Sequence, residues 1–250
     1  MGLRSTIATP SGKQRYVRQL FATIADRYDF ITVALSCGLD RMWKRRLINL
    51  AGLTAHDVVL DLACGTGDIL FAAAAKARLA VGLDLTLRML QLAAAKSPRA
   101  RAPLLTGDML ALPFPSARFS VVTVGYGLRN VSDLEHAIDE IHRVLAPGGR
   151  FLSLDFNRPS SALVRVVYLT YLTVVGSILG LALHRDPDTY RYIPESIRNY
   201  PGAEGVARLL VERGFTDVRV VPLLGGLMAI HHASKPGRNS VGGVVDPIVS

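Results

Sequence analysis

The chain has 250 residues, of which 50% are hydrophobic and 20% charged, and it carries a formal net charge of +9 at pH 7. This length suffices for one α/β domain with its own core, and the composition excludes a disordered chain. The two cysteines, Cys37 and Cys64, lack metal-ligand spacing, so neither a zinc site nor a disulfide framework is expected, and no metal is predicted. The polar N-terminus lacks the apolar stretch of a signal peptide, which favours a cytoplasmic location.

The first part of the chain is predicted to be helical after a short flexible arm. Residues 1–13 form the arm, and a single domain is expected over residues 14–235. Apolar residues recur every three or four positions over residues 17–28, which predicts an amphipathic helix. A second helix is predicted over residues 41–52 and closed by its final glycine, so that residues 14–57 make an N-terminal helical cap.

From Val58 onward, short apolar runs alternate with helical patterns, which predicts a parallel sheet covered by helices on both faces. A capping box of Ser132 and Glu135 predicts the start of one of these helices, and the Pro-Gly-Gly at 147–149 its end. The expected strands cover residues 58–64, 79–85, 103–108, 119–127 and 150–156.

The pattern changes after the fifth expected strand. Residues 157–205 are predicted to be a helical substrate cover that contains one long helix. Two apolar runs, 217–224 and 227–235, are separated by only two glycines and predict an antiparallel hairpin. Residues 236–250 are expected to be a flexible tail.

The long helix contains 18 consecutive uncharged residues, from Val166 to Leu183, which is the threshold length for a transmembrane span. Arg165 and His184 bound this run closely. Three interpretations stay open: a span, a core helix of an ordinary domain, and an apolar cover for a greasy substrate or a membrane contact.

A glycine turn, Gly65-Thr66-Gly67, lies between the first strand and the next helix, the usual context of a nucleotide-binding turn. The third glycine of the dinucleotide fingerprint is replaced by Leu70. A carboxylate at Asp68, where the helix begins, disfavours a pyrophosphate. The turn therefore predicts a nucleoside ligand without phosphate at this position.

Three acidic residues lie at the ends of successive predicted strands. Asp84 can accept hydrogen bonds from both ribose hydroxyls, and Asp108 can accept one from an adenine amino group. Asp61 can attract an ammonium group through the turn. Each acid alone could equally be a cap or turn residue, but the three together favour a cationic nucleoside, S-adenosylmethionine (SAM). These features resemble the class I SAM-dependent methyltransferases, which implies a Rossmann-like α/β fold with seven strands in the order 3-2-1-4-5-7-6.

Three longer segments resemble a narrower family, the ubiquinone/menaquinone biosynthesis C-methyltransferases. They are DRYDFITVALSCGLDRMWKR (26–45), LPFPSARFSVVTVGYGLRNVSD (112–133) and DPDTYRYIPESIRNYP (186–201), and the similarity covers about residues 16–235. The resemblance implies SAM-dependent C-methylation of a polyprenylated quinol ring, with demethylmenaquinol favoured. The alternatives are 2-methoxy-6-polyprenyl-1,4-benzoquinol in ubiquinone biosynthesis and another lipophilic phenol.

The resemblance also implies roles for individual residues. Arg129 is expected to stabilise a phenolate, and His231 is a candidate base, although a structural role is open for both. The expected cofactor-binding residues are Asp61, Gly65, Thr66, Gly67, Asp84, Asp108, Met109 and Gly125. The expected substrate-binding residues are Tyr28, Tyr126, Asn130, Tyr190 and Tyr192.

The partners expected besides the quinol are few. The apolar run could shelter the prenyl tail while the basic surface rests on anionic lipid at the inner face of the cell membrane. Basic and aromatic residues do not interleave as in a base-stacking platform, so no nucleic-acid partner is expected. A homodimer is left open.

Overall fold

The computed structural model describes residues 3–98, 102–159 and 161–237, and its centre is a seven-stranded sheet in the order β3-β2-β1-β4-β5-β7-β6. β7 is antiparallel to both of its neighbours, whereas the other pairs in the sheet are parallel. The predicted strand order is confirmed. The strands are β1 (Val58–Leu62), β2 (Leu79–Asp84), β3 (Leu104–Thr106), β4 (Phe119–Gly125), β5 (Leu145–Phe156), β6 (Thr216–Leu223) and β7 (Met228–Ser234).

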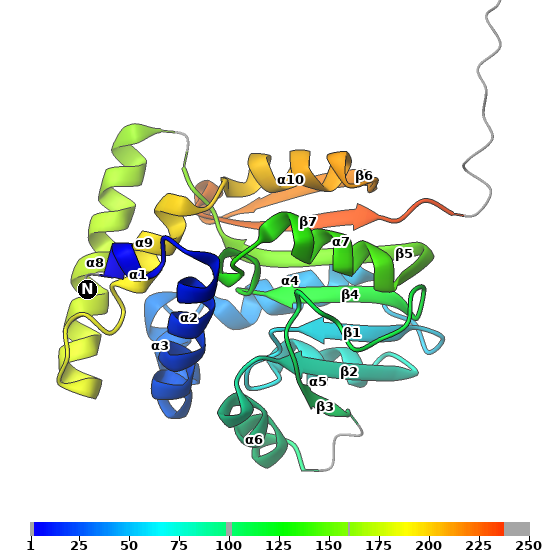
Figure 1. Cartoon of the computed structure of the whole chain (residues 1–250), viewed down its shortest axis with the longest axis horizontal. Coiled ribbons are helices and arrows are strands. Elements are labelled where there is room, and N and C mark those ends of the chain that lie inside the picture. The colour runs from blue at the N-terminus through cyan, green and yellow to red at the C-terminus, as the bar shows by residue number, and fades with distance from the viewer. Residues whose placement is uncertain (1–2, 99–101, 160, 238–250) are drawn as a thin grey trace, which may run out of the picture.

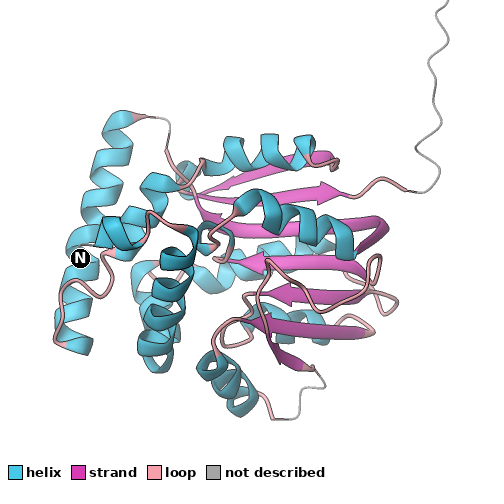
Figure 2. Cartoon of the chain, viewed as in Figure 1, coloured by secondary structure: helices cyan, strands magenta, loops and turns pink. Residues whose placement is uncertain are grey.

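Helices cover both faces of the sheet (Figure 2). Because successive side chains of a strand point to opposite faces, Leu60 packs with Ile138 of α7 on one side, and Val59 packs with Leu47 of α4 on the other. The helices are α1 (Leu3–Thr6), α2 (Pro10–Ile24), α3 (Tyr28–Leu35), α4 (Asp40–Ala51), α5 (Asp68–Ala74), α6 (Leu87–Lys96), α7 (Leu134–Val144), α8 (Ala162–His184), α9 (Tyr192–Asn199) and α10 (Gly202–Glu212). Three short 3-10 turns are η1 (Ala25–Arg27), η2 (Leu128–Asn130) and η3 (Leu224–Gly226).

The flexible arm predicted over residues 1–13 is wrong for its described part. Residues 3–6 form α1, and α2 begins at Pro10, where Thr9 caps it by accepting a hydrogen bond from the backbone of Gly12 at 3.2 Å. The predicted flexible tail lies outside the described residues from position 238 onward.

Some helix ends follow the local signals in the sequence, and others do not. Gly52 closes α4 in a left-handed conformation at φ 55°, as predicted. The predicted capping box at Ser132 is wrong, because Asp133 caps α7 and accepts from the backbone of His136 at 3.0 Å. The helix ends at Val144, and the predicted stop at 147–149 lies within β5.

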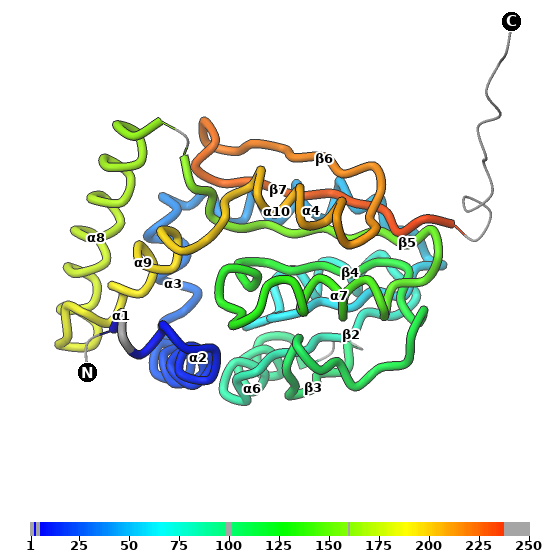
Figure 3. Tube along the Cα trace, turned by 45° about the horizontal axis from the view of Figure 1, so that its top comes forward, coloured from blue at the N-terminus to red at the C-terminus, as the bar shows by residue number. Residues whose placement is uncertain are grey.

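Four helices gather beyond the carboxyl ends of the parallel strands: α2, α3, α8 and α9 (Figures 1 and 3). This edge of an open α/β sheet is where ligands bind. α8 lies at the outside of the group, farthest from the sheet (Figure 1). The helical group therefore positions apolar side chains directly against the ligand-binding edge.

α8 is long and apolar enough to cross a membrane, and only 28% of its most apolar 18-residue stretch is buried within the structure. The core-helix interpretation is therefore wrong. Its exposed apolar side chains are Leu163, Val164, Val166, Val167, Tyr171, Val174, Ile178 and Leu181.

Candidate active site

The glycine turn connects β1 to α5 in a backbone conformation that favours glycine. Gly65 and Gly67 have φ values of 54° and 87°. A Cβ atom on Gly67 would lie 2.4 Å from the ring of Phe71, so the turn also leaves no space for a side chain there. The carboxylate of Asp84 accepts a hydrogen bond from the backbone of Gly65 at 2.8 Å, which ties the turn to the end of β2.

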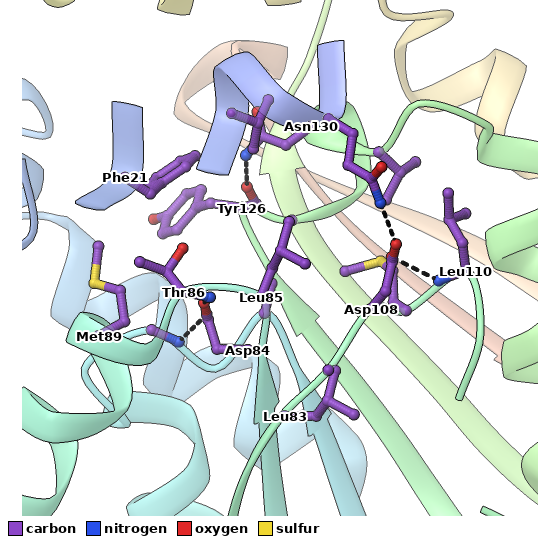
Figure 4. A pocket seen from close by; sticks show the side chains of 18 of the residues that line it. Phe21, Leu83, Asp84, Leu85, Thr86, Met89, Asp108, Leu110, Tyr126 and Asn130 are labelled. Carbon is purple, nitrogen blue, oxygen red and sulfur yellow. Dashed lines mark hydrogen bonds between the residues drawn. The ribbon is translucent and has the colours of Figure 1, made fainter. Parts of the chain in front are cut away.

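Asp84 and Asp108 line one pocket at this edge, which we call the nucleoside pocket (Figure 4). Asp84 also accepts from the backbone of Thr86 at 2.8 Å, while burial raises the pKa of its carboxyl group. Each carboxylate oxygen keeps a lone pair beyond its backbone bond, so Asp84 can still accept ribose hydroxyls. Of the other predicted cofactor residues, those lining the same pocket are Gly65, Met109 and Gly125.

Asp108 is already engaged by the protein. Its Oδ1 accepts from the backbone of Leu110 at 3.0 Å, and its Oδ2 accepts from the side-chain amide of Gln14 on α2. Sequence reasoning missed Gln14, because it lies 94 residues away from Asp108 along the chain and no motif marks it.

Asp61 lines a second, smaller pocket beside the turn, and Thr66 and Lys44 line it as well. Its Oδ1 accepts from Thr123 at 2.7 Å, whereas its Oδ2 makes no hydrogen bond of ordinary geometry within the described residues. Burial raises the pKa of Asp61 to about 7. An incoming ammonium group would supply the missing partner, so the acids present fit the amino-acid end of SAM as well as its nucleoside.

Asp68 is less repulsive toward anions than the sequence predicted. Its carboxylate pairs with Lys44 at 2.9 Å and with Lys96 at 2.5 Å, which lowers the pKa of Asp68 against the opposing effect of burial. A pyrophosphate is therefore disfavoured by Leu70 and by the carboxyl group of Asp61, and less by Asp68 than predicted. The hydroxyl of Thr66 donates to Asp29 at 2.5 Å.

A larger apolar cavity of about 620 Å³ adjoins the nucleoside pocket. α2, α3, α8 and α9 line it, and Phe21, Tyr28 and Tyr126 line both spaces. Drug-sized ligands are commonly held in cavities of roughly 300–1,000 Å³ with mostly apolar walls. The geometry therefore places a site for a bulky apolar molecule directly beside the nucleoside pocket.

Of the described residues that line the apolar cavity, Arg129 is the one that carries a charge. Its Nη1 donates to Asp155 at 2.6 Å and to the backbone carbonyl of Tyr126 at 3.0 Å, and the ring of Phe156 lies 4.5 Å from the guanidinium carbon. Burial opposes its charge, but Asp155 outweighs burial and raises the pKa of Arg129. Its Nε is buried and has no hydrogen-bond partner within the described residues.

The four predicted substrate tyrosines all line the apolar cavity, but their hydroxyls differ. Tyr126 donates to Asp40 at 2.7 Å, and burial followed by Asp40 raises its pKa well above the usual value. Tyr190 pairs with His184 at 2.8 Å, whereas the Tyr192 hydroxyl is buried without a partner within the described residues. These rings therefore form part of the wall of the apolar cavity. The raised pKa of the Tyr126 hydroxyl argues against proton transfer by that group. Tyr126 also has a positive φ of 59°, and Asn130, which lines the nucleoside pocket, donates to its carbonyl at 2.9 Å.

The structure does not bring His231 to the site. Both ring nitrogens are engaged, Nδ1 with the hydroxyl of Ser153 and Nε2 with the carbonyl of Ala203, each at 3.0 Å. The side chain is 1% exposed and lines none of the described pockets. Burial lowers the pKa of His231, which favours the neutral ring. The expectation of a base at this position is wrong, because both ring nitrogens form hydrogen bonds within the fold.

Solved structures resemble this fold at low sequence identity. A SAM-dependent methyltransferase from Thermotoga maritima superposes with a TM-score of 0.62 at 15% identity, over 88% of this chain and 99% of the other. Phosphoethanolamine N-methyltransferase 2 from Haemonchus contortus, solved with S-adenosyl-L-methionine, gives 0.57 at 16% identity over 78% of this chain and 52% of the other. These likenesses concern the fold.

The sheet order is that of the class I methyltransferase fold, and the family match identifies the chain as a SAM-dependent methyltransferase. More specifically, the chain belongs to the ubiE/COQ5 methyltransferase family, whose model matches residues 9–235. It is 38% identical over 240 residues to the ubiquinone/menaquinone biosynthesis C-methyltransferase UbiE of Azotobacter vinelandii, covering 90% of this chain and 92% of that one. It is 37% identical over 220 residues to the demethylmenaquinone methyltransferase of Mycolicibacterium gilvum, covering 88% and 95%.

Asp61→Asn is expected to weaken SAM binding and stabilise the ligand-free protein. Because the pKa is raised from 3.8 to about 7, the folded state binds more protons between these values and stability falls as pH rises through them. The neutral amide removes this penalty of up to about 4 kcal/mol. Thermal unfolding should show a gain at pH 8 that shrinks toward pH 4, while calorimetry shows SAM affinity about tenfold lower at pH 8. Equal melting shifts at both pH values would contradict the assignment.

Proposed function

We propose that this enzyme transfers the methyl group of SAM to a ring carbon of a polyprenylated quinol, with demethylmenaquinol as the acceptor. The observation that carries the proposal is the apolar cavity of about 620 Å³ beside the nucleoside pocket, with Arg129 in its wall. A fused, largely apolar ring fits such a space, with one of its two oxygens at Arg129. The names of the relatives from Azotobacter vinelandii and Mycolicibacterium gilvum support the same acceptor class.

SAM supplies an electrophilic methyl group on a positively charged sulfur. The contribution of the chain is to hold the acceptor in line with it and to exclude water. Tyr28 and Tyr126 line both spaces, so a ring packed against them lies next to the donor. Arg129, in the wall of the cavity, would stabilise the quinol oxygen as a phenolate once its proton has passed to solvent, which makes the neighbouring ring carbon nucleophilic. That carbon would take the methyl group as the S–CH₃ bond breaks, leaving S-adenosylhomocysteine, and the ring would then lose its hydrogen at that carbon as a proton to solvent.

The acceptor can be tested by direct competition. The protein is incubated with labelled SAM and an equal mixture of demethylmenaquinol and 2-methoxy-6-polyprenyl-1,4-benzoquinol, and the products are separated by mass. We expect label mainly in the naphthoquinol. Label mainly in the benzoquinol would support the ubiquinone branch instead, and label in neither would contradict the acceptor class.

The exposed face of α8 supports a second part of the proposal, contact with the inner face of the cell membrane. Leu163 and Val167 are 75% and 62% exposed and yet line the apolar cavity, so the cavity opens onto this apolar face. A prenyl tail could extend from the cavity along α8 without meeting water. The formal charge of +9 would favour anionic lipid.

Substituting serine for Val174 and Ile178 is expected to weaken binding to anionic vesicles by about tenfold or more, because two exposed apolar side chains lose their transfer into lipid. Neither residue lines the described cavity, so activity on a short-tailed quinol should persist. Val211→Ser on α10 is the matched control, because Val211 is 59% exposed. Vesicle flotation checks the result. Unchanged binding would contradict the membrane contact, and sedimentation separates it from self-association through the same face.

A further inference from the structure

α2 forms one wall of the nucleoside pocket. Gln14, Val17 and Phe21, all on this helix, line the pocket, whose volume is about 90 Å³. Sites for small molecules usually enclose roughly 300 Å³ or more. A nucleoside therefore needs α2, or the side chains that it contributes, to move outward.

Two side chains near the start of α2 hold it over the site. Lys13 donates to the backbone carbonyls of Arg129 at 3.0 Å and Val131 at 2.6 Å, and Gln14 donates to the carboxylate of Asp108. The Lys13 contacts anchor the helix to η2 and the residue after it without entering the pocket. The Gln14 contact differs, because it ends on an acid inside the pocket.

The donor of Gln14 is a planar –NH₂ group, and the exocyclic amino group of adenine has the same form and the same hydrogen-bonding role. Asp108 Oδ1 accepts from the backbone of Leu110, and Oδ2 accepts from Gln14 and from no backbone group within the described residues. An adenine amino group at Oδ2 would therefore compete with the side-chain amide of Gln14.

We propose that Gln14 is a latch residue that holds α2 over the nucleoside pocket through its hydrogen bond to Asp108, and that SAM displaces this side chain when it binds. This inference rests on the proposed placement of adenine at Asp108. Gln14 acts through the helix and is a positioning residue.

Gln14→Met keeps the length and helical preference of the side chain but removes the donor. Because a larger fraction of the protein is then open, we expect the association rate and the affinity for SAM to rise about three- to tenfold. Gln14→Ala is a second variant that tests the same loss. Gln19→Met is the matched control, because Gln19 lies on the exposed side of α2.

The binding kinetics provide an independent test. The association and dissociation rates of S-adenosylhomocysteine are measured by stopped flow in wild type and in each variant. The association rate should rise in Gln14→Met and Gln14→Ala and should keep its wild-type value in Gln19→Met. Affinity unchanged or weakened in Gln14→Met and Gln14→Ala would overturn the latch and leave the methyltransferase standing. Failure of wild type to bind S-adenosylhomocysteine would instead overturn the placement of the nucleoside.

Discussion

Asp84→Ala is expected to weaken SAM binding by about 2–3 kcal/mol, or roughly 30- to 150-fold in Kd. The variant removes the acceptor for the ribose hydroxyls. It also frees the backbone amides of Gly65 and Thr86, both held by this carboxylate at 2.8 Å. Because Gly65 belongs to the glycine turn, the loss should affect both the ligand contact and the shape of the turn.

Asp84→Asn separates these two effects. The amide oxygen can still accept one backbone hydrogen bond, so the turn should be better preserved than in the alanine variant, while the charge and one acceptor are lost. Calorimetric titration with SAM measures both variants. Asp139→Ala is the control, since its partner Arg213 forms a surface ion pair remote from the pocket. Wild-type affinity in Asp84→Ala would show that the ribose does not bind there.

Arg129→Ala is expected to lower turnover by about 10²- to 10³-fold while SAM affinity changes little, because the guanidinium is placed to stabilise charge on the quinol oxygen. The substitution also leaves Asp155, which is 2% exposed, without its partner at 2.6 Å. Breaking a buried pair costs about 3–5 kcal/mol of stability, so the single variant could lose activity by unfolding.

The double variant Arg129→Gln with Asp155→Asn removes both charges and resolves this ambiguity. It should fold more stably than Arg129→Ala and yet remain slow, whereas Arg129→Lys should recover part of the rate because it keeps a cation. Steady-state kinetics at saturating SAM, with melting curves beside them, distinguish the two effects. Arg213→Ala provides a control in which a surface ion pair is lost. A double variant with wild-type turnover would exclude Arg129 from catalysis.

The sheet could be predicted from the sequence because its signals are local. The apolar runs, the glycine turn and the left-handed Gly52 each act within a few neighbouring residues, and the structure places them as expected. The start of α7 shows the limit of such signals. The cap is predicted at Ser132, whereas the backbone places it one residue later, at Asp133.

Residues that depend on distant partners could not be predicted in the same way. His231 is a candidate base in the sequence, but its two ring nitrogens form hydrogen bonds with residues 78 and 28 positions away. Lys44, which lies 24 residues before Asp68, changes the electrostatics of the turn, and sequence reasoning did not assign it that role. The packing of α2 over Asp108 follows from the tertiary arrangement of the cap, and no pattern within α2 indicates it.

A crystal structure of the enzyme with S-adenosylhomocysteine and a short-tailed menaquinol tests the central claim most directly. We expect the ribose hydroxyls on Asp84 and the quinol ring in the apolar cavity, with one ring oxygen at the guanidinium of Arg129 and the tail directed toward α8. A quinol bound outside that cavity, or a nucleoside that leaves Asp84 without a ligand contact, would contradict the account.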